Sequence, residues 1–161
     1  MDKAQLAKDA IFAVPIYQDR DSPQERRNKD IVLETWRAFW SDDVDRGFAN
    51  MAEDVHWWNS GHGPLGSNLH GHDEIRKARK SELDFFADIE RTVIGFHAAG
   101  NTVIMEARAK AHLLDGTPYR NEACVVYELE GEMIVRVRHY VDTKKADAIA
   151  QMLDRRAQQG A

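Results

Sequence analysis

Residues 132–141 carry the histidine whose position best suits proton transfer. Charged and apolar side chains alternate through this segment with period two, which is the pattern of a strand with one buried face. The apolar set, which we expect to face inward, is Val135, Val137, His139 and Val141. Burial disfavours the charged form of an imidazole, so a neutral His139 in a dry cavity can act as a general base. The alternative is a buried histidine that only hydrogen-bonds a neighbouring carbonyl group.

Two other strand segments place polar side chains on their inward faces. The inward sets include Trp57 and Asn59 in residues 55–59, and Tyr119 and Asn121 in residues 119–129. Amide and phenol groups can donate a hydrogen bond to a developing oxyanion, which makes Asn59, Tyr119 and Asn121 candidate stabilisers. An inward asparagine can equally pin the end of a strand, and for Asn121 both interpretations stay open.

A predicted helix after Gly71 offers an arginine and a glutamate at the edge of its apolar stripe. Arg79 lies four residues after Ile75 and four before Leu83, and Glu82 lies on a similar line. A surface arginine whose stem covers the core is the commoner arrangement. If Arg79 turns inward, it would anchor a phenolate or a carboxylate, or pair with Glu82.

The histidines at positions 62, 70 and 72 invite a metal interpretation, which we set aside. On a loop the imidazoles of His70 and His72 share no fixed face, so no metal site is predicted. His70 directly precedes the predicted helix, and we expect it to contact substrate near the mouth of a cavity. Aromatic residues such as Trp36 and Trp57 are mostly core, but two or three of them in a cavity wall would favour a flat aromatic or polycyclic ligand.

These side chains must be positioned by helices and by a meander of strands. Helical spacing covers 28–41, a second short helix is capped near Asp42 or Asp43, and a closing helix covers 143–158. Strands are expected at 55–59, 89–99, 102–114, 119–129 and 132–141, with Gly-containing hairpin turns between the last four. Residues 1–14 are expected to form a short helix and 18–27 an exposed polar arm. The domains are therefore an arm, 1–27, and a single domain, 28–161.

Composition bounds the class of protein. The chain has 161 residues, 43% hydrophobic and 30% charged, which is typical of one globular domain. Its net charge of −5 disfavours nucleic-acid binding, which needs a clustered basic face. The only cysteine, Cys124, allows no internal disulfide, and no apolar run is long enough for a signal peptide or membrane span. We therefore expect a cytoplasmic protein.

The order of elements favours an α+β fold, in which a strongly curved antiparallel sheet wraps the N-terminal helices, leaves a cone-shaped cavity and is followed by a C-terminal helix. Four segments in this order resemble the nuclear-transport-factor-2-like superfamily, especially its SnoaL-type polyketide cyclase, ketosteroid isomerase and limonene-epoxide-hydrolase-like branches. They are Val32 to Trp40, Ala52 to Asn59, Leu69 to Ile75 and Gly131 to Asp142. The resemblance covers about residues 28–150. It implies that His139 stands where the family often has a carboxylate that works as acid or base.

The sequence departs from the epoxide-hydrolase branch at two places. The sequence Trp57-x-Asn59 is similar to the Tyr-x-Asn motif with which this branch binds a water molecule. Trp57 lacks the phenol group, so Asn59 alone would bind the water. The branch also uses an arginine and an aspartate two residues apart, whereas strand parity here puts small and apolar residues inward: Val103, Met105, Ala107, Ala109 and Ala111. Epoxide hydrolysis is therefore only a minor alternative.

The first hypothesis is a cofactor-independent acid/base enzyme, a lyase or an isomerase/cyclase, acting on a small hydrophobic, aromatic or polycyclic molecule. Its catalytic residues would be His139, Asn59 and Arg79, and its substrate contacts Trp36, Trp57, His70, Glu82, Tyr119 and Asn121. The second hypothesis is a non-catalytic ligand-binding or protein-interaction module. A cavity with a buried polar cluster would favour the enzyme, and a cone filled by side chains would favour the module. A homodimer through the outer sheet face is expected in either case, with no nucleic-acid or membrane partner.

Overall fold

The computed structural model describes residues 11–41, 43–62 and 66–159, and its strands form one sheet in the order β1-β4-β5-β6-β7-β2-β3. The strands are β1 Ile11–Phe12, β2 Met51–Asn59, β3 Ser67–His70, β4 Phe86–Ala99, β5 Thr102–Leu113, β6 Pro118–Glu130 and β7 Met133–Val141. The helices are α2 Pro23–Phe39, the 3-10 helix η1 Val44–Asn50, α3 Gly71–Leu83 and α4 Thr143–Gln159. The predicted α+β class, the four-strand meander and the closing helix are confirmed.

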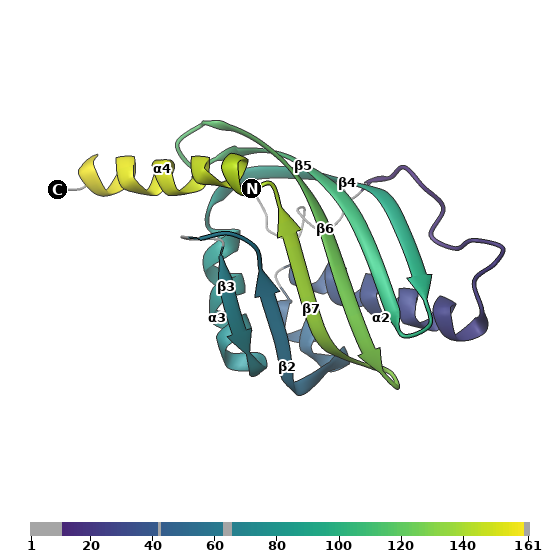
Figure 1. Ribbon diagram of the computed structural model, residues 1–161. Helices are drawn as coiled ribbons and strands as arrows, with labels where there is room; N and C mark the ends of the chain where they lie inside the picture. The colour runs from purple at the N-terminus through teal and green to yellow at the C-terminus, as the bar shows by residue number, and fades with distance from the viewer. Residues whose placement is uncertain (1–10, 42, 63–65, 160–161) are drawn as a thin grey trace.

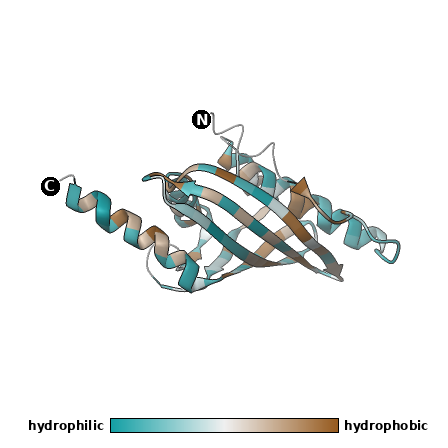
Figure 2. Cartoon of the chain, turned by 90° about the horizontal axis from the view of Figure 1, so that it is seen from above, coloured by the Kyte–Doolittle hydropathy of each residue, from teal (hydrophilic) through white to brown (hydrophobic). Residues whose placement is uncertain are grey.

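The long strands of the sheet curve, and α2 lies along their concave side (Figure 1). β4 to β7 pair in antiparallel fashion, β2 joins β7 in parallel, and β3 pairs with β2 at the edge. Inward residues of β5 and β6 are buried or half-buried, and outward ones are half-buried or exposed, which agrees with the predicted strand parity. Viewed from above, α4 projects beyond the sheet (Figure 2).

Two apolar clusters hold the layers together. The larger one joins α2 to the inner face of the sheet and includes Val32, Phe39, Val55, Phe96 and Val137. The smaller one fixes α4, whose Ile149 and Met152 are both 0% exposed, against Ala111, Leu113 and Tyr119. The apolar stripe that helical spacing predicts for this helix, Ala146, Ile149, Ala150 and Leu153, contains Ile149 but not Met152.

The parity predicted for β7 is wrong at one residue. Arg136 pairs with Glu128 and Ile134 pairs with Leu129, so Val135 falls in a bulge. Ile134 is therefore fully buried, while Val135 is half-buried. Beyond the bulge the expected alternation holds as far as His139.

The N-terminal region differs most from the prediction. α2 begins at Pro23 rather than at residue 28, because Ser22 and Glu25 form a capping box: Ser22 Oγ accepts from Glu25 N at 3.2 Å, and Glu25 Oε2 accepts from Ser22 N at 2.8 Å. Much of the expected exposed arm, 18–27, is thus the first turn of this helix. Of the helix expected over 1–14, residues 1–10 lie outside the described part, and Ile11–Phe12 pair with β4 in parallel.

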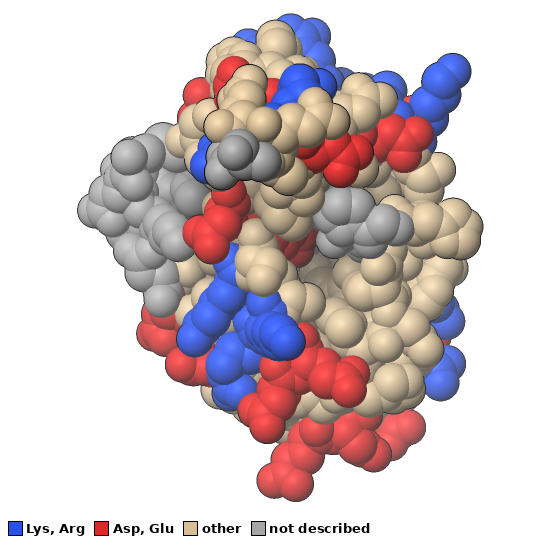
Figure 3. Space-filling model, turned by 90° about the vertical axis from the view of Figure 1, so that its left-hand side faces the viewer, with Lys and Arg blue, Asp and Glu red and all other residues tan. Residues whose placement is uncertain are grey.

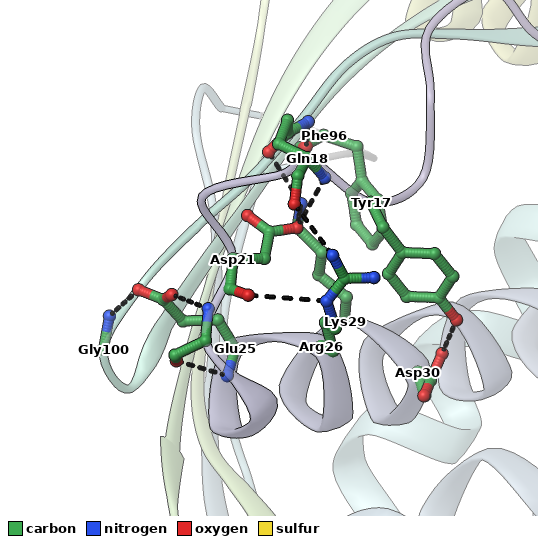
Figure 4. Close-up of polar contacts among 10 residues, drawn as sticks. Tyr17, Gln18, Asp21, Glu25, Arg26, Lys29, Asp30, Phe96 and Gly100 are labelled. Atoms are coloured by element: carbon green, nitrogen blue, oxygen red, sulfur yellow. Dashed lines mark hydrogen bonds and ion pairs between the residues drawn. The ribbon is translucent and has the colours of Figure 1, made fainter.

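A buried ion pair fastens the segment before α2 to that helix, and a hydrogen bond joins the same segment to the sheet (Figure 4). Lys29 Nζ lies 2.6 Å from Asp21 Oδ2, and the two side chains are 0% and 2% exposed. Lys29 also donates to Gln18 Oε1 at 2.8 Å, and Gln18 Nε2 donates to the Phe96 carbonyl of β4 at 2.9 Å. Residues 17–29 therefore form a continuous hydrogen-bonded connection between α2 and the sheet.

Candidate functional site

A cavity of about 110 Å³ lies between the concave face of the sheet, α2 and α3. Its wall is aromatic on the helix side, where Trp36, Phe39 and Trp40 meet Trp57 of β2. Small side chains of β5, Ala107 and Ala109, leave the space open on the sheet side, as the inward set of that strand predicted. Figure 3 views the molecule from the side of α3 and α4, where charged side chains surround a hollow near the middle of the face.

A polar row crosses three neighbouring strands at one end of this cavity. On the inner face, Ser67 of β3 lies opposite Asn59 of β2, and Asn59 lies opposite His139 of β7. On the next two strands the same row is apolar: Val125 of β6 lies opposite His139, and Met105 of β5 lies opposite Val125. His139 is half-buried, and its carbonyl accepts from Ser60 N at 2.9 Å, which fixes the end of β7 against β2. Sheet register alone therefore brings two of the three predicted catalytic residues, His139 and Asn59, together.

The contacts of Asn59 determine which nitrogen of His139 carries the proton. Trp57 Nε1, which can only donate, lies 2.9 Å from Asn59 Oδ1, so this atom must be the amide oxygen. Asn59 Nδ2 then donates to Ser67 Oγ at 2.6 Å. His139 Nδ1 lies 3.1 Å from the same Oδ1, and two acceptors would repel each other at this distance. Neutral His139 is therefore protonated at Nδ1 and has its free lone pair on Nε2.

Burial sets the charge state of His139. Removal from water lowers the pKa of His139 below the ordinary histidine value, the Glu82 carboxylate raises it in part, and the Arg79 guanidinium lowers it again. The net direction is downward, so the ring is neutral at neutral pH. An imidazole with its lone pair on Nε2 in the wall of an apolar cavity has the properties of a general base.

Arg79 turns into the cavity, which is the less common of the two arrangements considered from the sequence. Its guanidinium is 7% exposed and pairs with the Glu82 carboxylate. Its Nε and Nη2 both donate at 3.2 Å to the carbonyl of Phe39, a group that the end of α2 leaves without an intrahelical donor. The guanidinium also lies 4.0 Å from the centre of the Trp40 ring. Among the described residues these contacts use three of its five N–H groups, which leaves two for a ligand.

Arg91 is a site residue that the sequence reasoning missed. It lines the cavity from β4 with 4% exposure, and its guanidinium lies 4.1 Å from the Trp40 ring centre and 4.9 Å from that of Trp36. The signal was present in the strand alternation, because Arg91 falls between the buried Ile89 and Val93. A charged residue on an apolar face of a strand is a marker of a site.

Tyr119 and Asn121 line the cavity from β6, but only the phenol is available to a ligand. Asn121 Nδ2 donates to Tyr119 Oη at 2.8 Å and to Asp142 O at 3.1 Å, while its Oδ1 accepts from the backbone N–H of Glu122 and of Asp142. All four hydrogen-bonding positions of the amide are therefore used to pin the strand end. Burial raises the pKa of Tyr119, so its phenol keeps a proton to donate.

The histidines before and at the start of α3 take structural positions. His70 is exposed, stacks on His56 with 4.5 Å between ring centres and is not among the described residues that line the cavity. His72 Nε2 lies 2.9 Å from the Ala52 carbonyl, and its ring packs on Phe48. Over residues 11–41, 43–62 and 66–159, no group of three His, Cys, Asp or Glu side chains is arranged to hold a metal ion. The substrate contact expected for His70 thus finds no support in its position.

Solved structures that resemble this fold include the following three. An NTF2-like protein of unknown function from Burkholderia pseudomallei K96243 is 21% identical, with 76% of this chain and 96% of that chain covered and a TM-score of 0.68. TerC, co-crystallised with polyporic acid, is 17% identical, with 78% and 98% covered and a TM-score of 0.68. An LEH-like epoxide hydrolase of M. tuberculosis is 19% identical, with 79% and 91% covered and a TM-score of 0.60. At these identities the similarity shows a shared fold.

None of the curated proteins matches the sequence significantly. The family model described as the SnoaL-like domain matches residues 32–137. This range contains the second half of α2, all of α3 and most of the sheet. The chain therefore belongs to the SnoaL-like family and has the nuclear-transport-factor-2-like fold.

Proposed function

We propose that this protein is a cofactor-independent acid/base enzyme, a lyase or an isomerase/cyclase, that acts on a small hydrophobic ring compound bound in the cavity. The observation that carries the proposal is the hydrogen bond between His139 Nδ1 and Asn59 Oδ1, because it leaves Nε2 as the proton acceptor. The direction of the first step follows: His139 removes a proton from the substrate.

The proposed reaction needs a base, an electron sink and a water-poor cavity. His139 Nε2 takes a proton from a C–H or O–H group of the substrate, and the electron pair moves onto an adjacent carbonyl or ring oxygen. The two remaining N–H groups of Arg79 and the phenol of Tyr119 can donate to that oxygen as its charge develops. Return of the proton to another atom completes an isomerisation. In a lyase, loss of the proton is followed by breaking of a C–C or C–O bond, and protonated His139 returns the proton to the group that receives the electron pair. In a cyclase, the carbanion left by proton removal forms a C–C bond to a carbonyl carbon, and the proton returns to the oxygen of that carbonyl, so no redox change occurs.

The size of the cavity limits the substrate. An apolar cavity of about 150 Å³ accommodates benzene, so a cavity of about 110 Å³ has room for one ring at most. A polycyclic ligand would have to extend through the mouth. The aromatic side chains Trp36, Trp40 and Trp57 offer flat surfaces for such a ring.

The alternative function is a non-catalytic binding module, and the buried polar cluster argues against it. A module that only binds an apolar ring gains nothing from a half-buried histidine whose tautomer is fixed or from a buried arginine, since each costs desolvation. Epoxide hydrolysis stays a minor alternative, because β5 supplies Met105, Ala107 and Ala109 to the cavity where the epoxide-hydrolase branch is expected to have polar groups. The proposed homodimer through the outer sheet face and the cytoplasmic location stay predictions. Among the described residues, no helix is both long and apolar enough to cross a membrane.

The test uses polyporic acid and a panel of phenolic and polyketide-like ring compounds, incubated with the protein without added cofactor. We expect quenching of tryptophan fluorescence on binding and, for at least one compound, an absorbance change with exchange of a substrate hydrogen for solvent deuterium. Because the pKa of His139 is lowered, the rate should rise with pH through a midpoint below the ordinary histidine value of about 6.5 and level off near neutrality. A rate that instead falls over this range would contradict a neutral imidazole base.

Filling the cavity should weaken binding of a ligand at a limited cost in stability. Ala109→Leu adds three carbon atoms at the inner wall, and we expect at least a tenfold loss of polyporic acid affinity by fluorescence titration. The cost to stability should stay within about 1–3 kcal/mol, the range for overpacked sites. Ala87→Leu, at an exposed position on the same sheet, adds the same atoms outside the cavity and should bind as the wild type does. Equal affinity of both variants would place the ligand elsewhere.

A further inference from the structure

The side-chain amide of Asn121 can lie in only one orientation. The backbone N–H of Asp142, which can only donate, lies 3.1 Å from Oδ1, and the Asp142 carbonyl, which can only accept, lies 3.1 Å from Nδ2. The backbone N–H of Glu122 also donates to Oδ1, at 2.8 Å. Because backbone groups set this orientation, Nδ2 faces the phenol oxygen of Tyr119 whatever the hydroxyl group does, and these two atoms are 2.8 Å apart.

The contact with Asn121 fixes the direction of the Tyr119 O–H bond. The N–H of the amide can only donate, so the phenol oxygen accepts it. Conjugation keeps the hydrogen of a phenol near the plane of its ring, on one side of the oxygen or the other, and the Asn121 N–H occupies one of these sides. The hydrogen of Tyr119 therefore points away from Asn121. Within residues 11–41, 43–62 and 66–159 no group accepts it, and Tyr119 lines the cavity, so the acceptor must come from a molecule in the cavity.

The position of the phenol lets one ligand reach both Tyr119 and His139. Asn121 lies two residues beyond Tyr119 on the inner face of β6, so the hydrogen bond between them shows that the tyrosine side chain leans along the strand toward Val125. Val125 lies directly opposite His139 of β7, and all four residues line the cavity. The phenol thus offers a donor, and His139 Nε2 an acceptor, to the same space.

We propose that Asn121 is a positioning residue that turns the O–H of Tyr119 toward the ligand, so that the ligand must present an acceptor oxygen, such as that of a carbonyl group, at this point of the cavity. This role adds to the pinning of the strand end. It rests on the proposed function only for its catalytic meaning, because binding of an acceptor oxygen needs no turnover. Without Asn121 the hydrogen could lie on either side of the phenol oxygen, and the phenol could then meet a ligand as an acceptor.

The hydrogen bond from Asn121 also strengthens the phenol as a donor. Burial raises the pKa of Tyr119, the hydrogen bond from Asn121 lowers it in part, and the Glu82 and Asp142 carboxylates raise it again. The net direction is upward, so the phenol keeps its proton at neutral pH. A donor to the phenol oxygen draws electron density from the O–H bond, and hydrogen bonds in such a chain strengthen one another.

The test compares two rings of nearly the same shape, cyclohexanone and methylenecyclohexane, which differ by C=O against C=CH₂. NMR titration of the full chain gives the ratio of their dissociation constants for each variant. Tyr119→Phe removes the donor, and we expect the preference for cyclohexanone to fall about fivefold, the effect of one hydrogen bond of about 1 kcal/mol. Asn121→Asp should cause a loss of similar size with Tyr119 intact, because the carboxylate oxygen in place of Nδ2 accepts the phenol hydrogen and turns it away from the ligand.

Two controls separate positioning from general damage. Asn68→Asp adds the same charge at an exposed position of β3 and should keep the wild-type ratio. Adding Asn121→Asp to Tyr119→Phe should lower the ratio no further, because Asn121 acts on the ligand only through the phenol. A second readout does not require Asn121→Asp to fold: the C=O stretching frequency of bound, carbon-13-labelled cyclohexanone should be lower in the wild type than in Tyr119→Phe.

Each outcome decides the proposal. A wild-type ratio in Asn121→Asp, equal stretching frequencies in the wild type and Tyr119→Phe, or a wild type that binds neither ring would overturn it. If the ratios change as expected but no ring compound is turned over in the cofactor-free screen, the positioning stands and the proposed function fails. If a compound is turned over and the ratios do not change, the proposed function stands and the positioning fails.

Discussion

Replacement of His139 by glutamine should remove nearly all turnover and leave the fold intact. Glutamine is polar enough to hydrogen-bond Asn59, but it cannot accept a proton at neutral pH. A positioned general base contributes about 10²–10⁴-fold to the rate, and we expect kcat to fall by that factor on the substrate found in the cofactor-free screen. Affinity for polyporic acid should change little, because the aromatic wall of the cavity is untouched.

The control for this substitution is a second histidine on the same sheet. His112 lies on the outer face of β5, half exposed, with Nδ1 2.8 Å from Asp88 Oδ2. His112→Gln should keep wild-type kcat and KM, and circular dichroism with thermal unfolding should show that both variants fold. Full activity of His139→Gln would rule out the imidazole as the base, and Glu82, the carboxylate in the same cavity, would become the next candidate.

The period-two pattern of the strands predicted most of the cavity. Inward sets read from alternation placed His139, Asn59, Tyr119 and Ala109 correctly, since a slip by one residue would have exposed each of them. What alternation could not predict is register. That Ser67 and His139 flank Asn59 depends on a parallel pairing between strands some 80 residues apart, and the pairing is set by tertiary packing.

Charged side chains in the core were the hardest to predict, because their burial depends on partners from other elements. Arg79 is buried because the carbonyl of Phe39, forty residues earlier, and Glu82 receive its N–H groups. Lys29 lies just after the stretch 18–27 that was expected to be exposed, and it is 0% exposed because Asp21 and Gln18 surround its ammonium. The average exposure of charged residues reflects side chains without a partner. It therefore fails to predict burial where the partner comes from a distant segment of the chain.

The ion pair between Lys29 and Asp21 should be the costliest polar contact to break. Lys29→Met leaves a carboxylate at a position that is 2% exposed, with its principal charge partner removed. Breaking one member of a buried pair costs about 3–5 kcal/mol, and we expect a loss of that size in the free energy of urea unfolding. The double variant Asp21→Asn with Lys29→Met should recover much of the loss, because no unpaired charge then stays buried.

A solvent-exposed pair on the same chain serves as the matched control. Arg108 Nε lies 3.0 Å from Glu122 Oε1, and the two side chains are 62% and 61% exposed. Arg108→Met should therefore change stability by about 0–1 kcal/mol. If Lys29→Met costs no more than Arg108→Met, the segment before α2 is not held by this ion pair.

The same pair predicts how stability depends on pH. Burial by itself raises the pKa of Asp21. Hydrogen bonds from the Lys29 ammonium and from the backbone N–H of Gln18, together with the charge of Lys29, outweigh this effect and hold the pKa below its ordinary value. A carboxyl group with a lower pKa in the folded state adds stability above its unfolded-state pKa of about 3.9 and loses it as the pH falls through the folded value. The free energies of unfolding of the wild type and of the Asp21→Asn, Lys29→Met double variant should therefore come closer together as the pH falls. Unfolding midpoints measured from pH 7 downward check this, and a difference that stays constant to the lowest pH would show that Asp21 does not titrate with folding.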